Sequence, residues 1–443
     1  MSDARRTTTV RRKALAVGAL TLALATGLAG CSGSDGTATK GTPGAGAGVG
    51  SGAGVGSGAK KGPAAAPQTP RLIGDGSTAF TGAQPHQPVW HKLKPGETPP
   101  QFVVFSWDGA GEDSQKLFSH FRAVGKKYDA TMTYFLSGVY LLPEDKRELY
   151  DPPQHNAGSS DIGFNDVEGI RATVRELRGA WQEGNEIGTH FNGHFCGKEG
   201  GVGNWSVDEW KSEINQAKSF VKHWKTNAGL RAEQPLPFDY DKELVGARTP
   251  CLEGRTNFVR AAAQMGFRYD TSGVNDQIWP KKDLGLWDLS MQLVPVPGRA
   301  FQTLSMDYNF LVNQSGTTQG DPSQHRYWGD QMRDGLVQAF ERSYRGNRAP
   351  LIIGNHFESW NGGTYMRAVE ETIATVCVQR DVKCVSFRQL ADWLDAQDPD
   401  VIAKMRTLKV GEAPAAGWKA FLAPEPATPA AAGAQGVKPA ERR

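Results

Sequence analysis

The sequence predicts an α/β protein whose mostly parallel sheet is curled into a distorted (β/α) barrel of about seven strands, in a single domain. Two observations carry this prediction. Short apolar runs typical of buried strands alternate with segments of helical periodicity, which indicates parallel strands joined by helical crossovers. Nearly all aromatic residues lie between two compositionally simple ends, in a stretch whose length is normal for an α/β barrel with insertions.

The elements follow from these patterns in chain order. We expect strands at 102–107, 130–136, 185–190, 243–248, 267–272, 350–355 and 383–387, where apolar, β-branched or aromatic residues cluster. Helices are expected over 114–127, 166–181, 207–225, 257–265, 327–345 and 366–380, with a last one reaching Trp393. A long insertion is expected over 274–324. In such barrels the chemistry lies on loops at the carboxyl ends of the strands.

The N-terminal segment has the pattern of an export signal. "RRTTTVRRK" is basic, and the apolar run "ALAVGALTLALATGLAG" that ends before Cys31 is shorter than the roughly 20 residues of a bilayer span. "LAGC" resembles a bacterial lipobox, which implies cleavage before Cys31 and lipidation of its thiol. An ordinary signal peptide with an incidental cysteine is the alternative. We therefore expect an exported protein, anchored by a lipid on Cys31 to the outer face of the cytoplasmic membrane.

Composition divides the chain into four parts. Residues 1–30 are the expected signal peptide, and 31–75 are rich in Gly, Ala, Ser and Pro, as in a flexible tether. Residues 76–400 form the expected folded domain, and the Pro/Ala-rich segment 401–443 is expected to be a disordered tail. The formal net charge of the whole chain is +3, and loss of 1–30 changes it to −1 because five basic residues and one acidic residue are removed. This charge gives no case for nucleic-acid binding.

Two histidines stand four residues apart in "GNEIGTHFNGHF". His190 and His194 would share one face of a helical turn, an arrangement that presents two imidazoles to one metal ion. Two histidines that merely fall close together are the alternative. The zinc-protease form of this spacing needs Glu directly after the first histidine, and Phe191 stands there, so that class is excluded.

Three further motifs end predicted strands: "FSWDGAGED", "GARTPCLEG" and "PLIIGNHFES". Together with the histidine motif they resemble, in order, the motifs of the polysaccharide deacetylase family, also called the NodB-homology domain or carbohydrate esterase family four. The chitin-deacetylase-like branch fits best, because "RTPCLE" resembles its corresponding loop. The resemblance covers about 102–393 and implies a NodB-type barrel.

The resemblance also implies roles for single residues. Asp108 would be the catalytic base, Arg248 would orient it, and His356 would be the general acid. His190 and His194 would hold a divalent metal, with Zn²⁺ favoured and Co²⁺ or Ni²⁺ as alternatives.

Other positions line the implied substrate groove or admit two interpretations. Pro250 and Trp360 are expected to contribute to substrate binding, with Glu358 beside them. Asp270 lies where the family often has an acidic residue near the acid histidine, but we favour the interpretation that it caps the end of a strand.

One position departs from the family pattern. The first motif normally carries two consecutive Asp residues, and here Gly109 stands where the metal-binding Asp is expected. Asp108 is then the base, with metal held by the two histidines, waters and either Glu112 or Asp113. Alternatively Asp108 is the third ligand and another group is the base, or the site is inactive.

Four cysteines follow Cys31, and an even number in an exported protein indicates two disulfides. Cys196 follows the histidine pair and Cys251 lies in the Arg-Thr-Pro loop, so both should lie on one face of the barrel and bond. Cys377 and Cys384 flank a short helix-to-strand loop that a second bridge would close.

The family resemblance implies a metal-dependent hydrolase that removes N-acetyl groups, or alternatively O-acetyl groups, from a glycan such as peptidoglycan or a chitin-like polymer. With the export signal, we expect it to act outside the cytoplasm, as a monomer. A catalytically impaired glycan-binding lipoprotein on the same fold is the alternative, and Gly109 supports it. A solute-binding lipoprotein of a transporter is a third class, but it needs two α/β lobes and gives the histidine pair no role.

Overall fold

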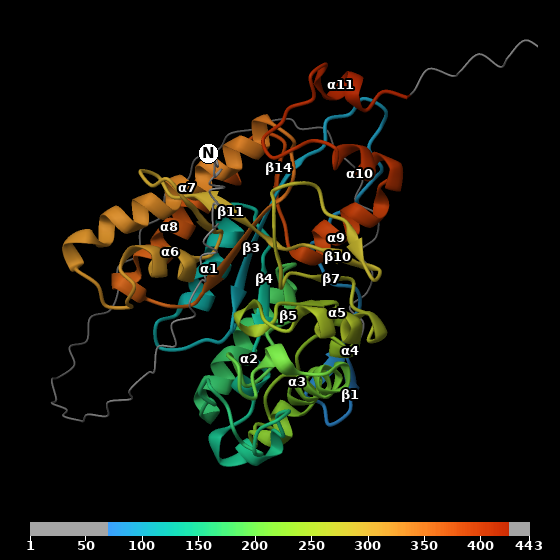
Figure 1. Cartoon of the computed structure of the whole chain (residues 1–443). Helices are drawn as coiled ribbons and strands as arrows, with labels where there is room; N and C mark the ends of the chain where they lie inside the picture. The colour runs from blue at the N-terminus through green and yellow to red at the C-terminus, as the bar shows by residue number, and fades with distance from the viewer. Residues whose placement is uncertain (1–69, 425–443) are drawn as a thin grey trace, which may run out of the picture. The chain divides into compact units, whose positions relative to one another are not determined.

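A computed structural model of the chain describes residues 70–424, and a nine-stranded sheet is its central element (Figure 1). The strands, in sheet order, are β13 (Leu351–His356), β3 (Gln101–Asp108), β4 (Thr133–Leu136), β5 (Glu186–Thr189), β6 (Gly246–Ala247), β7 (Tyr269–Asp270), β10 (Leu286–Asp288) and β9 (Lys282–Asp283), while β14 (Val382–Cys384) also pairs with β3. All pairs are parallel except β9 with β10.

The predicted α/β fold with a curled, mostly parallel sheet is therefore confirmed. The sheet has nine strands because the insertion adds β9 and β10 beyond β7. Within residues 70–424 the end strands β13 and β9 are not hydrogen-bonded to each other, so the barrel is open there.

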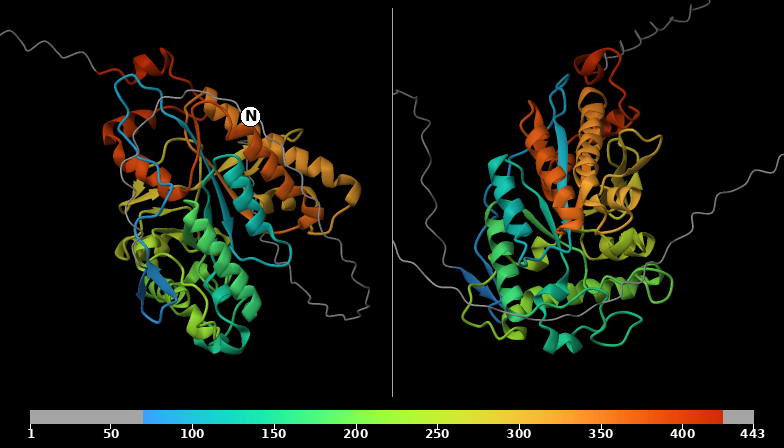
Figure 2. Two further views of the ribbon diagram at one scale, coloured as in Figure 1. Left: turned by 180° about the vertical axis from the view of Figure 1, so that it is seen from behind. Right: turned by 90° about the vertical axis from the view of Figure 1, so that its left-hand side faces the viewer.

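Helices connect the strands and cover the sheet. They are α1 (Leu117–Lys127), α2 (Val167–Gln182), α3 (Val207–Asn227), α4 (Tyr240–Glu243), α5 (Arg255–Gln264), α6 (Asp307–Gln314), α7 (His325–Arg345), α8 (Trp360–Val376), α9 (Phe387–Ala396), α10 (Pro399–Met405) and α11 (Gly417–Phe421). The expected cap of α2 is present, since the Asp166 carboxylate accepts from the Gly169 amide. Helices α7 and α8 lie side by side (Figures 1 and 2).

Both faces of the sheet are buried, as the continuous apolar strands require. Along β3, Val103, Phe105 and Trp107 belong to one hydrophobic cluster, which also contains residues of α2 and α3. Phe102 and Val104 belong to a second cluster, shared with residues of α9 and α10. Successive strand residues point to opposite faces, so one run of apolar residues packs against two layers.

The insertion is an ordered part of the fold. It forms β8 (Val274–Asn275), β11 (Met291–Pro295) and β12 (Gln302–Leu304), which pair as a separate three-stranded sheet, and then α6. An isolated bridge joins Met306 to Gly354 on β13, so the insertion reaches the end of the sheet where β13 finishes.

The predicted domain boundaries need correction at both ends. The folded part begins before residue 76, because β1 (Arg71–Ile73) pairs with β2 (Thr78–Phe80). The segment predicted as a disordered tail from 401 contains most of α10 and all of α11, and Ile402 and Met405 are buried in the core. Alanine and proline dominate the composition there, but two apolar side chains suffice to dock a short helix.

The predicted signal peptide, Cys31 and most of the tether lie outside the described residues, as does 425–443. Among the helices of the described part of the chain, none has both the length and the apolar character needed to cross a membrane.

Both predicted disulfides are present. Cys196–Cys251, with Cα atoms 6.1 Å apart, joins the loop after β5 to the loop after β6. Cys377–Cys384, at 5.6 Å, joins the end of α8 to β14. The two bridges close loops of very different length, with sequence separations of 55 and 7 residues.

We predict that the longer bridge contributes more to the free energy of unfolding. Loss of loop-closure entropy in the unfolded chain gives about 4 kcal/mol for Cys196–Cys251 and about 2.5 kcal/mol for Cys377–Cys384. Urea unfolding of the two double Cys→Ala variants measures these losses, with the oxidised wild type as reference. An equal loss, or a larger loss for the shorter bridge, would contradict the prediction.

Candidate active site

Polar side chains converge at the carboxyl edge of the parallel strands. Asp108 ends β3 and His356 ends β13, and the two residues are register partners in this parallel pair. His190 follows β5 and Arg248 follows β6, two neighbouring strands of the same sheet. Adjacent strands lie about 4.8 Å apart, so these four residues share one edge of the sheet.

Arg248 is fully buried, and its guanidinium donates to groups of one strand, β3, and of the loop after β7. Nη1 donates to the Asp108 carboxylate at 2.8 Å and to Ser106 Oγ at 3.0 Å. Nε donates to the Thr271 carbonyl and Nη2 to its hydroxyl, at 3.3 and 3.2 Å. The cation also lies over the Phe135 ring, 5.0 Å from its centroid. Arg248 is therefore held in one position and fixes one oxygen of Asp108.

The charge on Asp108 follows from this contact. Burial alone would raise the pKa of its carboxyl, but the positive charges of Arg248 and His356 hold the pKa below the ordinary value. The group is ionised at neutral pH, as a proton acceptor must be.

His190 and His194 face each other with ring centroids 5.0 Å apart. His190 Nδ1 donates to the Arg248 carbonyl at 2.9 Å, so Nε2 is the ring nitrogen that is not used in this bond. Burial lowers the pKa of His190 to about 3 and lowers that of His194 as well, so both rings are neutral. Nearby Cys196 Sγ is 3.6 Å from His194 Nδ1.

The donor set fits a divalent metal. A neutral imidazole that donates its second ring N–H to a backbone carbonyl is the usual state of a metal-binding histidine, and His190 shows that bond. His190 and His194 would hold the ion, and the Asp108 oxygen that Arg248 does not bind lies at the same strand edge.

The Gly109 position is shaped for glycine. Its φ is +66°, a left-handed conformation that other residues rarely adopt, and a Cβ there would lie 3.5 Å from Tyr140 Oη. Ser137 Oγ lies on the same side and has no hydrogen-bond partner among residues 70–424. A buried hydroxyl without a partner indicates that a polar group or water belongs beside it.

Two predicted substitutes for the missing ligand are bound to the backbone instead. Glu112 is buried and accepts from the amides of Asp113 and Ser119 at the start of α1. Asp113 accepts from the Gln115 amide. Neither contact involves the histidine pair.

His356 has a partner that sequence reasoning missed. Its Nδ1 lies 2.8 Å from Asp307 Oδ1, and its backbone N–H donates to Asp307 Oδ2 at 2.7 Å. Asp307 is the first residue of α6 and is fully buried. Burial would lower the pKa of His356, but the Asp307 charge raises it to about 9. An Asp at a helix start resembles an ordinary cap, so the sequence offered no distinguishing signal.

Asp270 is not the carboxylate that contacts His356. This agrees with our interpretation of Asp270 as a residue that caps the end of a strand. Its carboxylate lies at the end of β7, pairs with Arg255 Nε at 2.6 Å and accepts from the Ser272 amide. These contacts make it a buried structural carboxylate.

Aromatic side chains stand beside His356. Trp360 has its ring 5.4 Å from that of His356, and Tyr308, the residue after Asp307, has its ring 5.9 Å from that of Trp360. Tyr308 is 49% exposed. Pro250 is buried at the start of the turn after Arg248, beside the bridged Cys251. Solvent therefore reaches an aromatic surface next to His356.

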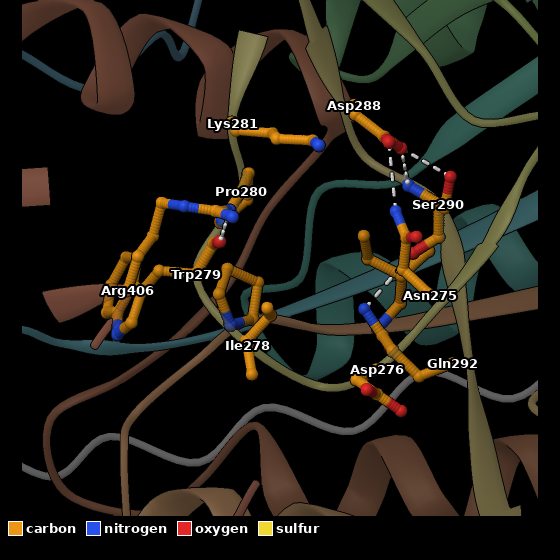
Figure 3. A pocket seen from close by; sticks show the side chains of 12 residues that line it. Asn275, Asp276, Ile278, Trp279, Pro280, Lys281, Asp288, Ser290, Gln292 and Arg406 are labelled. Carbon is orange, nitrogen blue, oxygen red and sulfur yellow. Dashed lines mark hydrogen bonds between the residues drawn. The ribbon is translucent and has the colours of Figure 1, made fainter. Parts of the chain in front are cut away.

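A cavity of about 150 Å³ lies elsewhere on the chain (Figure 3). Pro350 and Ile352 line it at the start of β13, whereas His356 ends that strand. Arg406 and Asp288 lie on opposite sides of it in Figure 3, and both already bond to the protein, through Trp279 O and Ser290. The cavity is separate from the residues described above.

Comparison with known proteins gives structural similarity only. No protein-family model matches the sequence, and no curated protein matches it. The chain is similar to a protein from Mycobacterium smegmatis assigned to the polysaccharide deacetylases, with 15% identity, a TM-score of 0.44, and 70% of this chain and 94% of the other covered.

Two further solved structures belong to the same group. A peptidoglycan deacetylase from Bacillus subtilis is 13% identical, with a TM-score of 0.34 over 68% of this chain and 94% of its own. A CE4 family pseudoenzyme from Bacillus anthracis is 12% identical, with a TM-score of 0.35 over 70% of both chains. The structures similar to this chain thus include polysaccharide and peptidoglycan deacetylases and a pseudoenzyme of that family.

Proposed function

We propose that the protein is a metal-dependent hydrolase that removes N-acetyl groups from a polysaccharide. One observation carries the proposal: an ionised, buried carboxylate, Asp108, is the register partner of a histidine, His356, whose pKa is raised, and a neutral imidazole pair lies at the same strand edge. A base, an acid and a metal pair together are the groups that hydrolysis of an acetamide needs.

The roles follow from the charges of the side chains. The chemistry that a divalent metal supplies at His190 and His194 is polarisation of the acetyl carbonyl and acidification of water. Asp108, fixed by Arg248, accepts the proton of the water that attacks the carbonyl carbon. His356, protonated beside Asp307, donates its proton to the leaving nitrogen as the C–N bond breaks, which releases acetate and an amine.

The aromatic surface supports a sugar substrate. The exposed Tyr308 and the partly exposed Trp360 lie beside the proton donor. A binding site for a small polar molecule commonly combines aromatic surface with a few placed polar groups. We propose an N-acetylated glycan of the peptidoglycan or chitin type. We further propose export with a lipid on Cys31, and a monomeric chain.

A glycan-binding protein without activity is the second candidate, and Gly109 favours it. The side chain that would complete the metal site is absent, and the Tyr140 hydroxyl lies beside that position. The two candidates share the fold and the aromatic surface, and they differ in whether acetate is released.

The first prediction is that the chain, supplied with Zn²⁺ or Co²⁺, releases acetate from N-acetylglucosamine oligomers or from peptidoglycan. Released acetate is measured enzymatically, and the same chain with excess chelator is the control. If no N-acetylated glycan yields acetate at saturating metal while oligomers still bind, the binding-protein candidate replaces the hydrolase.

The second prediction concerns Asp108→Asn. Asparagine keeps the shape and the contact with Arg248 but accepts no proton, so we expect turnover to fall about 10²- to 10⁴-fold while bound zinc stays at the wild-type level. Metal content by mass spectrometry and circular dichroism are measured alongside. Loss of the zinc would instead make Asp108 the third ligand.

The third prediction uses the pH profile. The Asp307 charge raises the pKa of His356 to about 9, so Asp307→Asn should move the alkaline limb of kcat/KM downward, toward the ordinary histidine value of about 6.5. Activity at pH 8 should then fall about tenfold or more, because less His356 is protonated. Asp270→Asn is the matched control: it also removes a buried carboxylate charge, but one paired with Arg255, and should leave the limb in place.

A further inference from the structure

The loop that carries both histidines has an unfavourable backbone conformation. Phe191 and His194 have φ values of 63° and 59°, in the left-handed region that residues other than glycine seldom occupy. Such conformations cost of order 1–3 kcal/mol each and persist only where the surroundings hold them. The contacts of residues 191–194 therefore decide where the two imidazoles point.

Gly193, between the two histidines, is held through both of its backbone polar groups. Its N–H donates to the Tyr150 hydroxyl at 3.0 Å, and its carbonyl accepts from the Asp161 amide at 2.8 Å. A Cβ at this position would lie 2.9 Å from the Tyr150 ring, so the backbone packs directly on that ring. Tyr150 itself is fully buried.

Tyr150 is held in turn by a buried carboxylate on α3. Its hydroxyl donates to Glu213, whose two oxygens lie 2.9 and 3.2 Å away. Glu213 is 1% exposed, and no Lys, Arg or His of the described chain forms an ion pair with it. Burial raises the pKa of this carboxyl to about 7, although the hydrogen bonds from Tyr150 and Asn192 act against that shift.

The same α3 segment holds the loop at a second point. Asn192 Nδ2 donates to the Glu213 backbone carbonyl at 3.0 Å, and Asn192 is fully buried. Two consecutive loop residues therefore depend on Glu213. Asn192 bonds to the Glu213 backbone carbonyl, and Gly193 is linked through Tyr150 to the Glu213 carboxylate. A buried carboxyl without a cation costs free energy. The side chains that act on it here are Tyr150, which bonds to Gly193, and Asn192, which belongs to the histidine loop itself.

We propose that Tyr150 and Glu213 are positioning residues for the metal pair. The chain Glu213–Tyr150–Gly193 fixes the peptide between His190 and His194, and thereby sets both imidazoles for one ion. This inference rests on the metal site of the proposed function, but it does not require that the site be catalytic. Outer partners of metal-binding histidines typically change metal affinity about 10- to 100-fold when they are removed.

The chain contains a matched control for this test. Tyr269 is also fully buried and donates its hydroxyl to a buried carboxylate, Glu186, at 2.9 Å. That pair joins β7 to the start of β5 and makes no hydrogen bond to residues 191–194. Tyr269→Phe therefore removes the same group from the same kind of partner, away from the loop.

The experiment measures Zn²⁺ affinity by competition with a chromogenic chelator for wild type, Tyr150→Phe, Glu213→Gln and Tyr269→Phe, with thermal unfolding of each chain. Tyr150→Phe should weaken affinity about 10- to 100-fold. Glu213→Gln keeps an acceptor for the hydroxyl and should retain affinity within about threefold, as should Tyr269→Phe. In the metal-free chains, hydrogen exchange of a peptide spanning 190–196 should accelerate in Tyr150→Phe alone.

The outcomes separate this inference from the proposed function. Equal zinc affinity and equal exchange in Tyr150→Phe and Tyr269→Phe would overturn it, whether or not acetate is released. Weakened zinc binding in Tyr150→Phe alone supports it, even if the wild type proves inactive. If Tyr150→Phe does not fold, Glu213→Leu removes the acceptor and is expected to show the same loss. A wild type that binds no divalent metal would overturn the metal site and this inference together.

Discussion

The buried guanidinium of Arg248 is the contact on which the candidate site depends. Its side chain fixes the carboxylate of Asp108, and its backbone carbonyl accepts from His190 Nδ1. One residue therefore orients both the proposed base and a proposed metal ligand. It follows β6, which pairs with neither β3 nor β13. Breaking a buried ion pair commonly costs about 3–5 kcal/mol, because the remaining charge is left without compensation. The charges at this edge are consequently part of the fold as well as of the chemistry.

Two kinds of support hold the strand edge around that contact. The parallel pairing of β3 with β13 places Asp108 beside His356. Both faces of β3 are buried, so a shift in register would expose apolar core residues. The histidine loop, by contrast, departs from regular structure and is held by side chains of the surrounding segments. The strands position the proposed acid and base, while the proposed metal pair relies on Tyr150 and on Glu213 of α3, which lie outside its loop.

Much of this arrangement could be predicted from the sequence, because apolar runs mark the strands and chemically active residues follow them. The spacing of the histidines singled out His190, and the resemblance to family motifs at predicted strand ends singled out Asp108, Arg248 and His356. Asp307 was missed because it lies in an insertion without clear periodicity, and Tyr150 was missed because nothing near it in the sequence marks its role. Helices α10 and α11 were missed because the segment is rich in alanine and proline, which indicated disorder, although Ile402 and Met405 are buried.

The neighbouring positions Asp307 and Tyr308 have a consequence for how the site could diversify. One tunes the acidity of His356 and the other presents its ring to solvent beside Trp360, yet both belong to the first turn of α6. A change that moves the Tyr308 ring would also move the carboxylate that keeps His356 charged. The exposed Tyr308 ring and the carboxylate that keeps His356 protonated therefore depend on the same helical turn. Evolution or engineering of the one is constrained by the other.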